Sequence, residues 1–144
     1  MIAVDTNLLV YSHRAEVPQY TVANKLLLGM GRGGAAWAIP WQCLHEFFGV
    51  VTNPRVFRTP TPRAGALAQI DAWLASPSLV VLHETPRHWD TLKPLIQIGE
   101  IDGPRIHDAR IAALCLQHGV RELWSADRDF RRFPALTVRN PLAD

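Results

Sequence analysis

MIAVDTNLLVYS, residues 1–12, places three apolar residues, Ile2 to Val4, directly before the carboxylate of Asp5. A short apolar run that ends at a polar residue is typical of a buried strand, and residues 6–11 can begin a helix. In open α/β sheets, ligand sites gather beyond the carboxyl ends of the strands. Asp5 is therefore a candidate site residue, although an aspartate here can also simply cap the next helix.

Length and composition predict one globular domain. The chain has 144 residues, of which 48% are hydrophobic, enough for one core and short for two. It contains no apolar stretch of membrane-spanning length and no signal-peptide pattern at its start, so we expect a soluble, cytoplasmic protein with no membrane partner. Cys43 and Cys115 lie in apolar stretches and are expected to be buried thiols.

The charge balance is nearly even, with a formal net charge of +2, and alone indicates no partner. Thirteen of the fifteen basic residues are arginine. The guanidinium group suits phosphate binding, but a GC-rich genome also favours arginine over lysine. Arginine content therefore leaves phosphate binding open.

Strand and helix signals alternate along the chain. Strands are expected at residues 2–4, 35–40, 79–82 and 122–125, with 136–138 as a candidate fifth. Helices are expected between them, with Pro18, Pro86 and Pro104 in first turns and the glycines at 29–34 ending the second helix. Right-handed β-α-β crossovers then predict an α/β fold with a central, mainly parallel sheet of four to five short strands flanked by helices.

Glu46 lies on the helix expected at residues 41–52. On a helical wheel Cys43 and Phe47 belong to a broad apolar face, and Gln42 and His45 lie opposite. Glu46 falls at the border between these faces. Such a glutamate is usually a solvated flank residue, but it can also lean over the edge of a cleft.

Asp108 is harder to explain as a surface residue. With the helix starting at Pro104, it lies in the second turn and shares a face with Ile111 and Cys115, toward the core. An unpaired carboxylate there is costly and should be neutralised, paired or bound to a cation. A salt bridge with Arg105 or Arg110 is the structural alternative.

Two further aspartates, Asp127 and Asp129, follow the strand expected at 122–125. A turn rich in serine and aspartate would explain them without any function. However, Asp5 and Asp127 both follow strands, Asp108 lies near the start of the helix before the strand at 122–125, and Glu46 lies on the helix after the strand at 35–40, so the four can converge. Carboxylates that share one cleft need a compensating cation, and oxygen ligands favour Mg²⁺ or Mn²⁺.

Four segments in this order resemble a known family: VDTN (4–7), LHEFFGVVTNP (44–54), HDARIAA (107–113) and LWSADRDF (123–130). The chain resembles the PIN domain, and specifically the VapC-type ribonuclease toxins of bacterial and archaeal toxin–antitoxin pairs. The resemblance covers essentially the whole chain, residues 1–144, in length and in the order of elements and motifs. Each motif is weak alone, and the ordered set of four is specific.

The resemblance implies a catalytic quartet formed by Asp5, Glu46, Asp108 and Asp127. Among these, Asp5, Asp108 and Asp127 would bind Mg²⁺ or Mn²⁺, and a metal-activated water would hydrolyse RNA phosphodiester bonds. Asn7 and Ser125 match polar positions that support the site, and Thr6 is expected to be only a helix-start residue. Whether Asp127 or Asp129 supplies the fourth carboxylate stays open.

The implied partners are an RNA substrate, a cognate VapB-type antitoxin and a second copy of the chain in a homodimer. Arginines near the acidic motifs are candidate RNA contacts: Arg55, Arg58, Arg128 and Arg131. Two alternatives remain from other classes. One is a non-catalytic PIN-like module that binds RNA or protein, and the other is a phosphatase or receiver-like protein with an acidic pocket.

Overall fold

The structure is a computed structural model and describes residues 1–143. Strands and helices alternate along the chain, as expected. The elements are β1 (Ile2–Val4), α1 (Thr6–His13), α2 (Tyr20–Arg32), β2 (Trp37–Pro40), α3 (Trp41–Val51), α4 (Arg63–Leu74), β3 (Leu79–Leu82), α5 (His88–Ile98), the 3₁₀ turn η1 (Gly103–Arg105), α6 (Ile106–Gln117), β4 (Glu122–Trp124), η2 (Arg128–Arg132) and β5 (Thr137–Arg139). The candidate fifth strand is therefore present.

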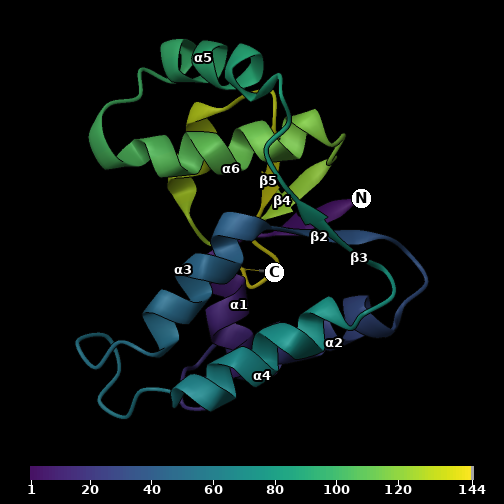
Figure 1. The fold of residues 1–144 in the computed structure, drawn as a ribbon, viewed down its shortest axis with the longest axis vertical. Coiled ribbons are helices and arrows are strands. Elements are labelled where there is room, and N and C mark those ends of the chain that lie inside the picture. The colour runs from purple at the N-terminus through teal and green to yellow at the C-terminus, as the bar shows by residue number, and fades with distance from the viewer. Residues whose placement is uncertain (144) are drawn as a thin grey trace.

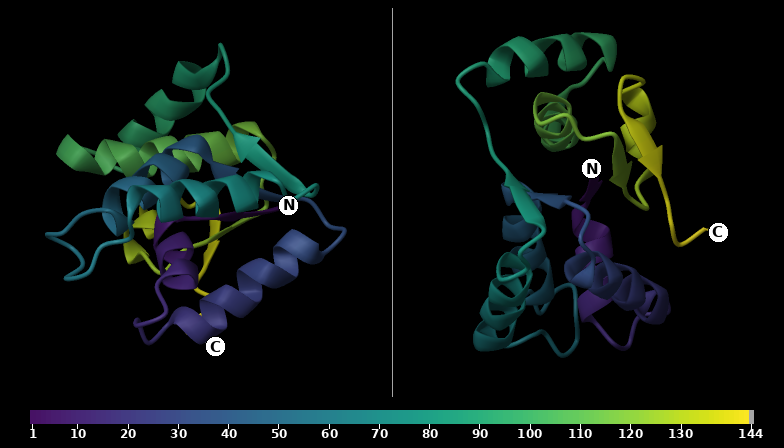
Figure 2. Two further views of the ribbon diagram at one scale, coloured as in Figure 1. Left: turned by 60° about the horizontal axis from the view of Figure 1, so that its bottom comes forward. Right: turned by 90° about the vertical axis from the view of Figure 1, so that its right-hand side faces the viewer.

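The five strands form one sheet in the order β3-β2-β1-β4-β5, and all four strand pairs are parallel. Helices α5 and α6 lie on one side of this sheet, and α1, α2 and α4 lie on the other (Figures 1 and 2). The α/β class and the predicted parallel sheet are thus confirmed. From β1 the chain adds strands in one direction, and it then returns to place β4 on the other side of β1. This reversal creates a topological switch point between β1 and β4.

The core is formed where the sheet packs against its helices. Ala3 of β1, Ile39 of β2 and Leu123 of β4 have no exposed surface, and Cys43 and Cys115 are fully buried free thiols, as expected. Burial of such apolar side chains is the main favourable contribution to folding. Within residues 1–143, no helix has the length and apolar character needed to cross a membrane.

Two helices begin later than their prolines predicted. Pro18 and Pro86 each occupy the second position of a turn, which a backbone hydrogen bond closes over residues 17–20 (3.1 Å) and 85–88 (3.0 Å). The fixed φ angle of proline suits that turn position. Helices α2 and α5 therefore start at the last residue of each turn rather than at the proline.

Helix α2 ends within the expected glycine stretch, at Arg32 with Gly33 as its C-cap. The start of the helix near residue 104 differs from expectation. Pro104 lies in the 3₁₀ turn η1, so that α6 starts only at Ile106. Asp108 consequently lies in the first turn of α6, not in the second as the sequence predicted.

Candidate active site

The candidate site lies at the switch point between β1 and β4. Val4 pairs with Trp124 in the parallel register, so the next residues on each strand, Asp5 and Ser125, lie opposite one another. The Asp5 amide continues the ladder by donating to the Trp124 carbonyl (3.0 Å). Strand register therefore brings together two polar residues that are 120 positions apart in the sequence.

Asp5 is buried, with 5% of its surface exposed, and both of its carboxylate oxygens accept hydrogen bonds. Oδ1 accepts from the Thr6 amide (2.7 Å) and the Cys43 thiol (3.7 Å). Oδ2 accepts from the Ser125 hydroxyl (2.7 Å) and the Asn7 amide group (3.4 Å). Burial raises the pKa of Asp5 above its usual value, and the hydrogen bonds from Ser125 and Thr6 oppose that rise. Asp5 also caps α1, so the structural role proposed from the sequence is real.

Asn7 and Ser125 link Asp5 to the segment that carries Asp127. The Asn7 side chain donates to Ser125 Oγ (3.3 Å), and its oxygen accepts from the Ala126 amide (3.3 Å). Ser125 Oγ in turn accepts from the Asp127 amide (3.0 Å). These contacts fix the orientation of two of the candidate acids relative to each other.

Three carboxylates meet beside Asp5, from the start of α6 and the segment after β4. One oxygen of each of Asp108, Asp127 and Asp129 lies within 4.8 Å of the others. Asp127 Oδ1 also accepts from the Asp129 amide (2.8 Å), which holds these two residues in one turn. An oxygen-only donor set of this kind fits a hard divalent cation such as Mg²⁺ or Mn²⁺.

The helical wheel predicted that Asp108 would point into the core. In the structure it is only half-buried, at the edge where this cluster forms. Burial, followed by the charge of Asp127, raises the pKa of Asp108 to about 6. The salt bridge considered from the sequence does not form: Arg105 pairs with Asp129 (3.4 Å), and Arg110 pairs with Glu84 (2.9 Å).

Glu46 is connected to the site by a hydrogen bond from Thr6, a contact that the sequence did not predict. The hydroxyl of Thr6 donates to Glu46 Oε2 (2.7 Å), although Glu46 is an exposed residue of α3. This hydrogen bond joins the start of α1 to the middle of α3. Thr6 thus does more than start a helix, and no local sequence pattern indicated its partner 40 residues away.

All four residues of the expected quartet line one hollow of about 380 Å³. The lining residues are Asp5, Thr6, Asn7, Val10, Tyr11, Glu46, Val50, Val56, Phe57, Asp108, Ile111 and Asp127. Asp129 belongs to the carboxylate cluster but does not line this hollow. The structure therefore places both Asp127 and Asp129 near Asp108, and places only Asp127 beside Glu46 and Asp5 as well.

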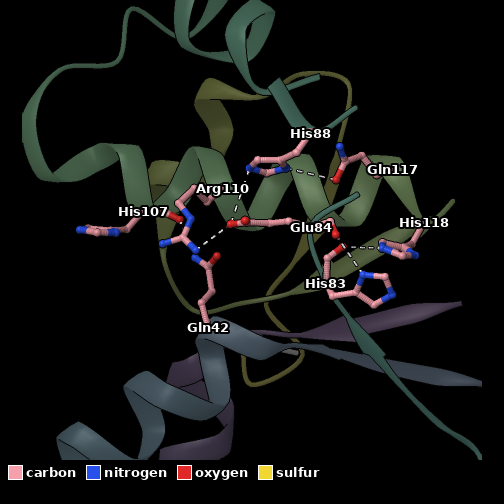
Figure 3. A network of polar contacts seen from close by, with 8 residues as sticks. All are labelled: Gln42, His83, Glu84, His88, His107, Arg110, Gln117 and His118. Atoms are coloured by element: carbon pink, nitrogen blue, oxygen red, sulfur yellow. Dashed lines mark hydrogen bonds and ion pairs between the residues drawn. The ribbon is translucent and has the colours of Figure 1, made fainter. Parts of the chain in front are cut away.

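Gln42 differs from the helical-wheel prediction, which placed it on the polar face of α3. It is buried, with 7% of its surface exposed, and its side-chain nitrogen donates to the His107 carbonyl (2.9 Å). Figure 3 shows Gln42 reaching from α3 toward α6. This side chain connects the helix that carries Glu46 to the turn that carries Asp108. A wheel drawn for one helix contains no information about a second helix that covers its polar side.

The arginines considered as RNA contacts lie around the acidic hollow rather than in it. Arg55 and Arg58 are exposed on the segment between α3 and α4, and Arg128 and Arg131 are exposed on η2. None of them is among the described residues that line the hollow.

Comparison with known families identifies the fold. The sequence profile of the PIN domain matches residues 2–136, which is nearly the whole chain. The chain belongs to the PIN domain family. This PIN domain is 38% identical to VapC ribonuclease Mb2897 of Mycobacterium bovis over 142 residues. The match covers 99% of this chain and 96% of the relative. It is 31% identical over 143 residues to Ribonuclease VapC31 of Mycobacterium tuberculosis, covering 99% of the chain and all of the relative.

Solved structures share the fold of this PIN domain. One is Mycobacterium tuberculosis VapC20, a Sarcin-Ricin loop cleaving toxin, with a TM-score of 0.67 and 18% identity over 91% of this chain and 93% of that one. Another is VapBC2 from Rickettsia felis bound to a DNA fragment from its promoter, with a TM-score of 0.64 and 22% identity over 97% and 98% of the two chains. The resemblance to VapC-type PIN domains is confirmed.

Proposed function

We propose that this PIN domain is a Mg²⁺- or Mn²⁺-dependent endoribonuclease that acts in the cytoplasm as the toxin of a toxin–antitoxin pair. The observation that carries the proposal is the meeting of Asp108, Asp127 and Asp129 oxygens within 4.8 Å, beside a hollow that Asp5 and Glu46 also line. Several carboxylates this close together repel one another when ionised, and a bound cation offsets that repulsion. Relatives of 31–38% identity that are named ribonucleases support RNA as the substrate.

The residues have distinct proposed roles. Asp5, Asp108 and Asp127 would hold the metal, and Asp129, which has an oxygen within 4.8 Å of one oxygen of Asp108 and one of Asp127, is a further candidate ligand. The bound cation would lower the pKa of water and offset charge on the phosphate. Asn7 and Ser125 orient Asp5 through the hydrogen bonds described above.

We assign Glu46 the role of general base. Thr6 engages Oε2 of Glu46 (2.7 Å), and we assign Oε1 to accept a proton from the attacking water. Cleavage by water requires no substrate 2′-hydroxyl as nucleophile, so a preference for RNA has to come from binding.

The proposed partners follow from the same family. We infer a VapB-type antitoxin that binds this chain, and a homodimer as the assembled form. The relation to a VapBC assembly from Rickettsia felis supports the antitoxin at the level of the fold.

The test is cleavage of RNA by purified protein carrying Asp5→Asn or Asp108→Asn. Each change removes one carboxylate charge and keeps the side-chain volume, so RNA cleavage in Mg²⁺ should fall at least about 100-fold while circular dichroism stays unchanged. Asp71→Asn, on the exposed surface of α4, is the matched control and should cleave normally.

Metal binding is measured separately by calorimetry with Mn²⁺. Uptake of Mn²⁺ should depend on Asp108 and not on Asp71. Undiminished cleavage in both the Asp5 and Asp108 variants, or cleavage that continues in EDTA, would refute the proposed function. Mn²⁺ uptake without any RNA cleavage would identify a non-catalytic module instead.

A further inference from the structure

A second hollow adjoins the acidic one. It has a volume of about 640 Å³ and lies between the end of α1 and the segment that joins α3 to α4. The lining residues are His13, Arg14, Ala15, Glu16, Val56, Phe57, Arg58, Thr59, Pro60, Thr61 and Pro62. Val56 and Phe57 line both hollows, so they form the wall between the acidic site and this second hollow.

The segment that forms this wall is held in one conformation by hydrogen bonds to its surroundings. The Thr61 amide donates to the Val51 carbonyl (2.7 Å). Arg14 donates to the Thr59 carbonyl (2.6 Å) and to the Thr61 hydroxyl (3.0 Å). The second hollow is therefore preformed, and a ligand would not have to order the segment in order to bind.

The wall offers apolar surface next to the acidic site. Val56 is 53% exposed, so its side chain is accessible to a ligand. The ring of Phe57 is half-buried, and the Arg14 guanidinium lies over one of its faces, 4.2 Å from the centroid. A base would therefore contact the part of the ring that Arg14 does not cover, as bases contact aromatic side chains in other single-strand sites.

The charges of the second hollow leave one cation for a ligand. Arg14 is engaged by Glu16 as well as by the backbone, so these two charges offset each other. Arg58 is exposed, and the ion pairs formed within residues 1–143 do not include it. Arg58 is thus the cation of this hollow that can neutralise an incoming anion.

We propose that the second hollow binds single-stranded RNA on one side of the cleaved bond. A base next to the cleavage position contacts Val56 and Phe57, and the phosphate beyond it contacts Arg58. Paired bases of a duplex are stacked on their neighbours and are not free to lie on this wall, so the site favours unpaired RNA. The inference rests on the proposed function, because it takes the acidic hollow as the place of cleavage.

The experiment compares Arg58→Gln with Arg121→Gln. Each variant loses one positive charge, but Arg121 directly precedes β4, at the end of that strand opposite to Asp127. Both changes are made in the Asp108→Asn background, and binding is followed by fluorescence anisotropy of a short, labelled, single-stranded oligoribonucleotide of mixed sequence. Arg58→Gln should weaken binding several-fold and reduce the slope of log K against log salt by roughly 0.7, as expected for one lost phosphate contact. Arg121→Gln should change neither.

Phe57→Leu tests the wall itself while keeping apolar bulk in place. Loss of the ring should weaken binding of the single strand roughly five-fold or more, with little effect on a duplex of the same sequence. Equal affinities of Arg58→Gln and Arg121→Gln for the RNA single strand would overturn the inference. It would also be overturned if Arg58→Gln lost more affinity for an acidic peptide than for the RNA, because this would indicate a protein-binding site.

Kinetics in the catalytically intact protein separate this inference from the proposed function. If the protein cleaves RNA in a metal-dependent manner, Arg58→Gln should raise KM several-fold and leave kcat near that of Arg121→Gln. Metal-dependent cleavage with the same KM in both variants would overturn the inference and leave the proposed function intact. Absence of any cleavage would refute the proposed function, and the anisotropy measurement would still decide whether Arg58 binds RNA.

Discussion

At the scale of single residues, Asp5 shows that a structural role and a role in the site can coincide. The position that ends β1 also begins α1, so Asp5 both caps the helix and points into the acidic hollow. Hydrogen bonds from Thr6, Asn7, Cys43 and Ser125 hold its carboxylate in one orientation. A carboxylate fixed in this way needs no reorganisation when a cation or substrate binds.

Thr6→Val tests whether the hydroxyl of Thr6 positions Glu46. Valine has the same shape but cannot donate to Glu46 Oε2, so we expect kcat for RNA cleavage to fall roughly ten-fold, the scale of one hydrogen bond to a charged group. KM and the unfolding midpoint should change little. Thr6→Ser restores the hydroxyl and should recover most of kcat.

A double-mutant cycle identifies the partner of Thr6. In a Glu46→Gln background, Thr6→Val should have little further effect on kcat, because the charge that Thr6 positions is already absent. Additive effects of the two changes, or a Thr6→Ser variant as slow as Thr6→Val, would show that Thr6 acts otherwise.

At the scale of elements, α6 is fixed at both ends relative to the rest of the fold. Near its start, His107 accepts from Gln42 of α3. Farther along, Arg110 pairs with Glu84, and a ring nitrogen of His118 lies 2.8 Å from the His83 carbonyl, in the segment after β3 (Figure 3). These contacts set the position of the turn that carries Asp108.

Gln42→Met tests the link between α3 and α6. Methionine fills a similar volume and removes one hydrogen bond, but it also removes the Gln42 side-chain oxygen, which is buried and has no partner among the described residues. These effects oppose each other, so the free energy of unfolding should change by less than about 1 kcal/mol. Cleavage should nevertheless slow several-fold, because Glu46 and Asp108 lose their fixed separation. The control is Gln97→Met on the exposed surface of α5, and equal kcat values in the two variants would contradict the prediction.

At the scale of the whole molecule, local patterns predicted the strands, their parallel arrangement and the carboxylates at strand ends. They could not predict contacts that depend on where distant elements meet. The register of β1 and β4 brings Ser125 to Asp5, and the packing of α3 beside α1 brings Glu46 to Thr6. Gln42 was misplaced for the same reason, since its burial depends on α6. The order of the PIN-like motifs predicted which acids belong to the site, and the pairing of β1 with β4 explains why Asp5 and Asp127 lie close together.

The crowding of these acids makes a final prediction about the stability of the whole protein. Burial and neighbouring carboxylates raise the pKa of Asp108 from 3.8 to about 6. Between these values the folded protein retains a proton that the unfolded chain has released, so the free energy of unfolding falls as the pH rises through this range. Removing the charge with Asp108→Asn should therefore stabilise the metal-free protein near pH 7.5, by roughly 1 kcal/mol after allowance for solvent screening of a half-buried group. The difference should vanish near pH 4.

The difference is measured by urea unfolding in EDTA, followed by tryptophan fluorescence. Asp71→Asn is the control and should show no such pH dependence. Added Mn²⁺ should stabilise the wild type more at pH 7.5 than at pH 5, because protons compete with the cation for Asp108. A metal-free Asp108→Asn protein less stable than wild type at pH 7.5 would mean that the acids do not repel one another in the folded state.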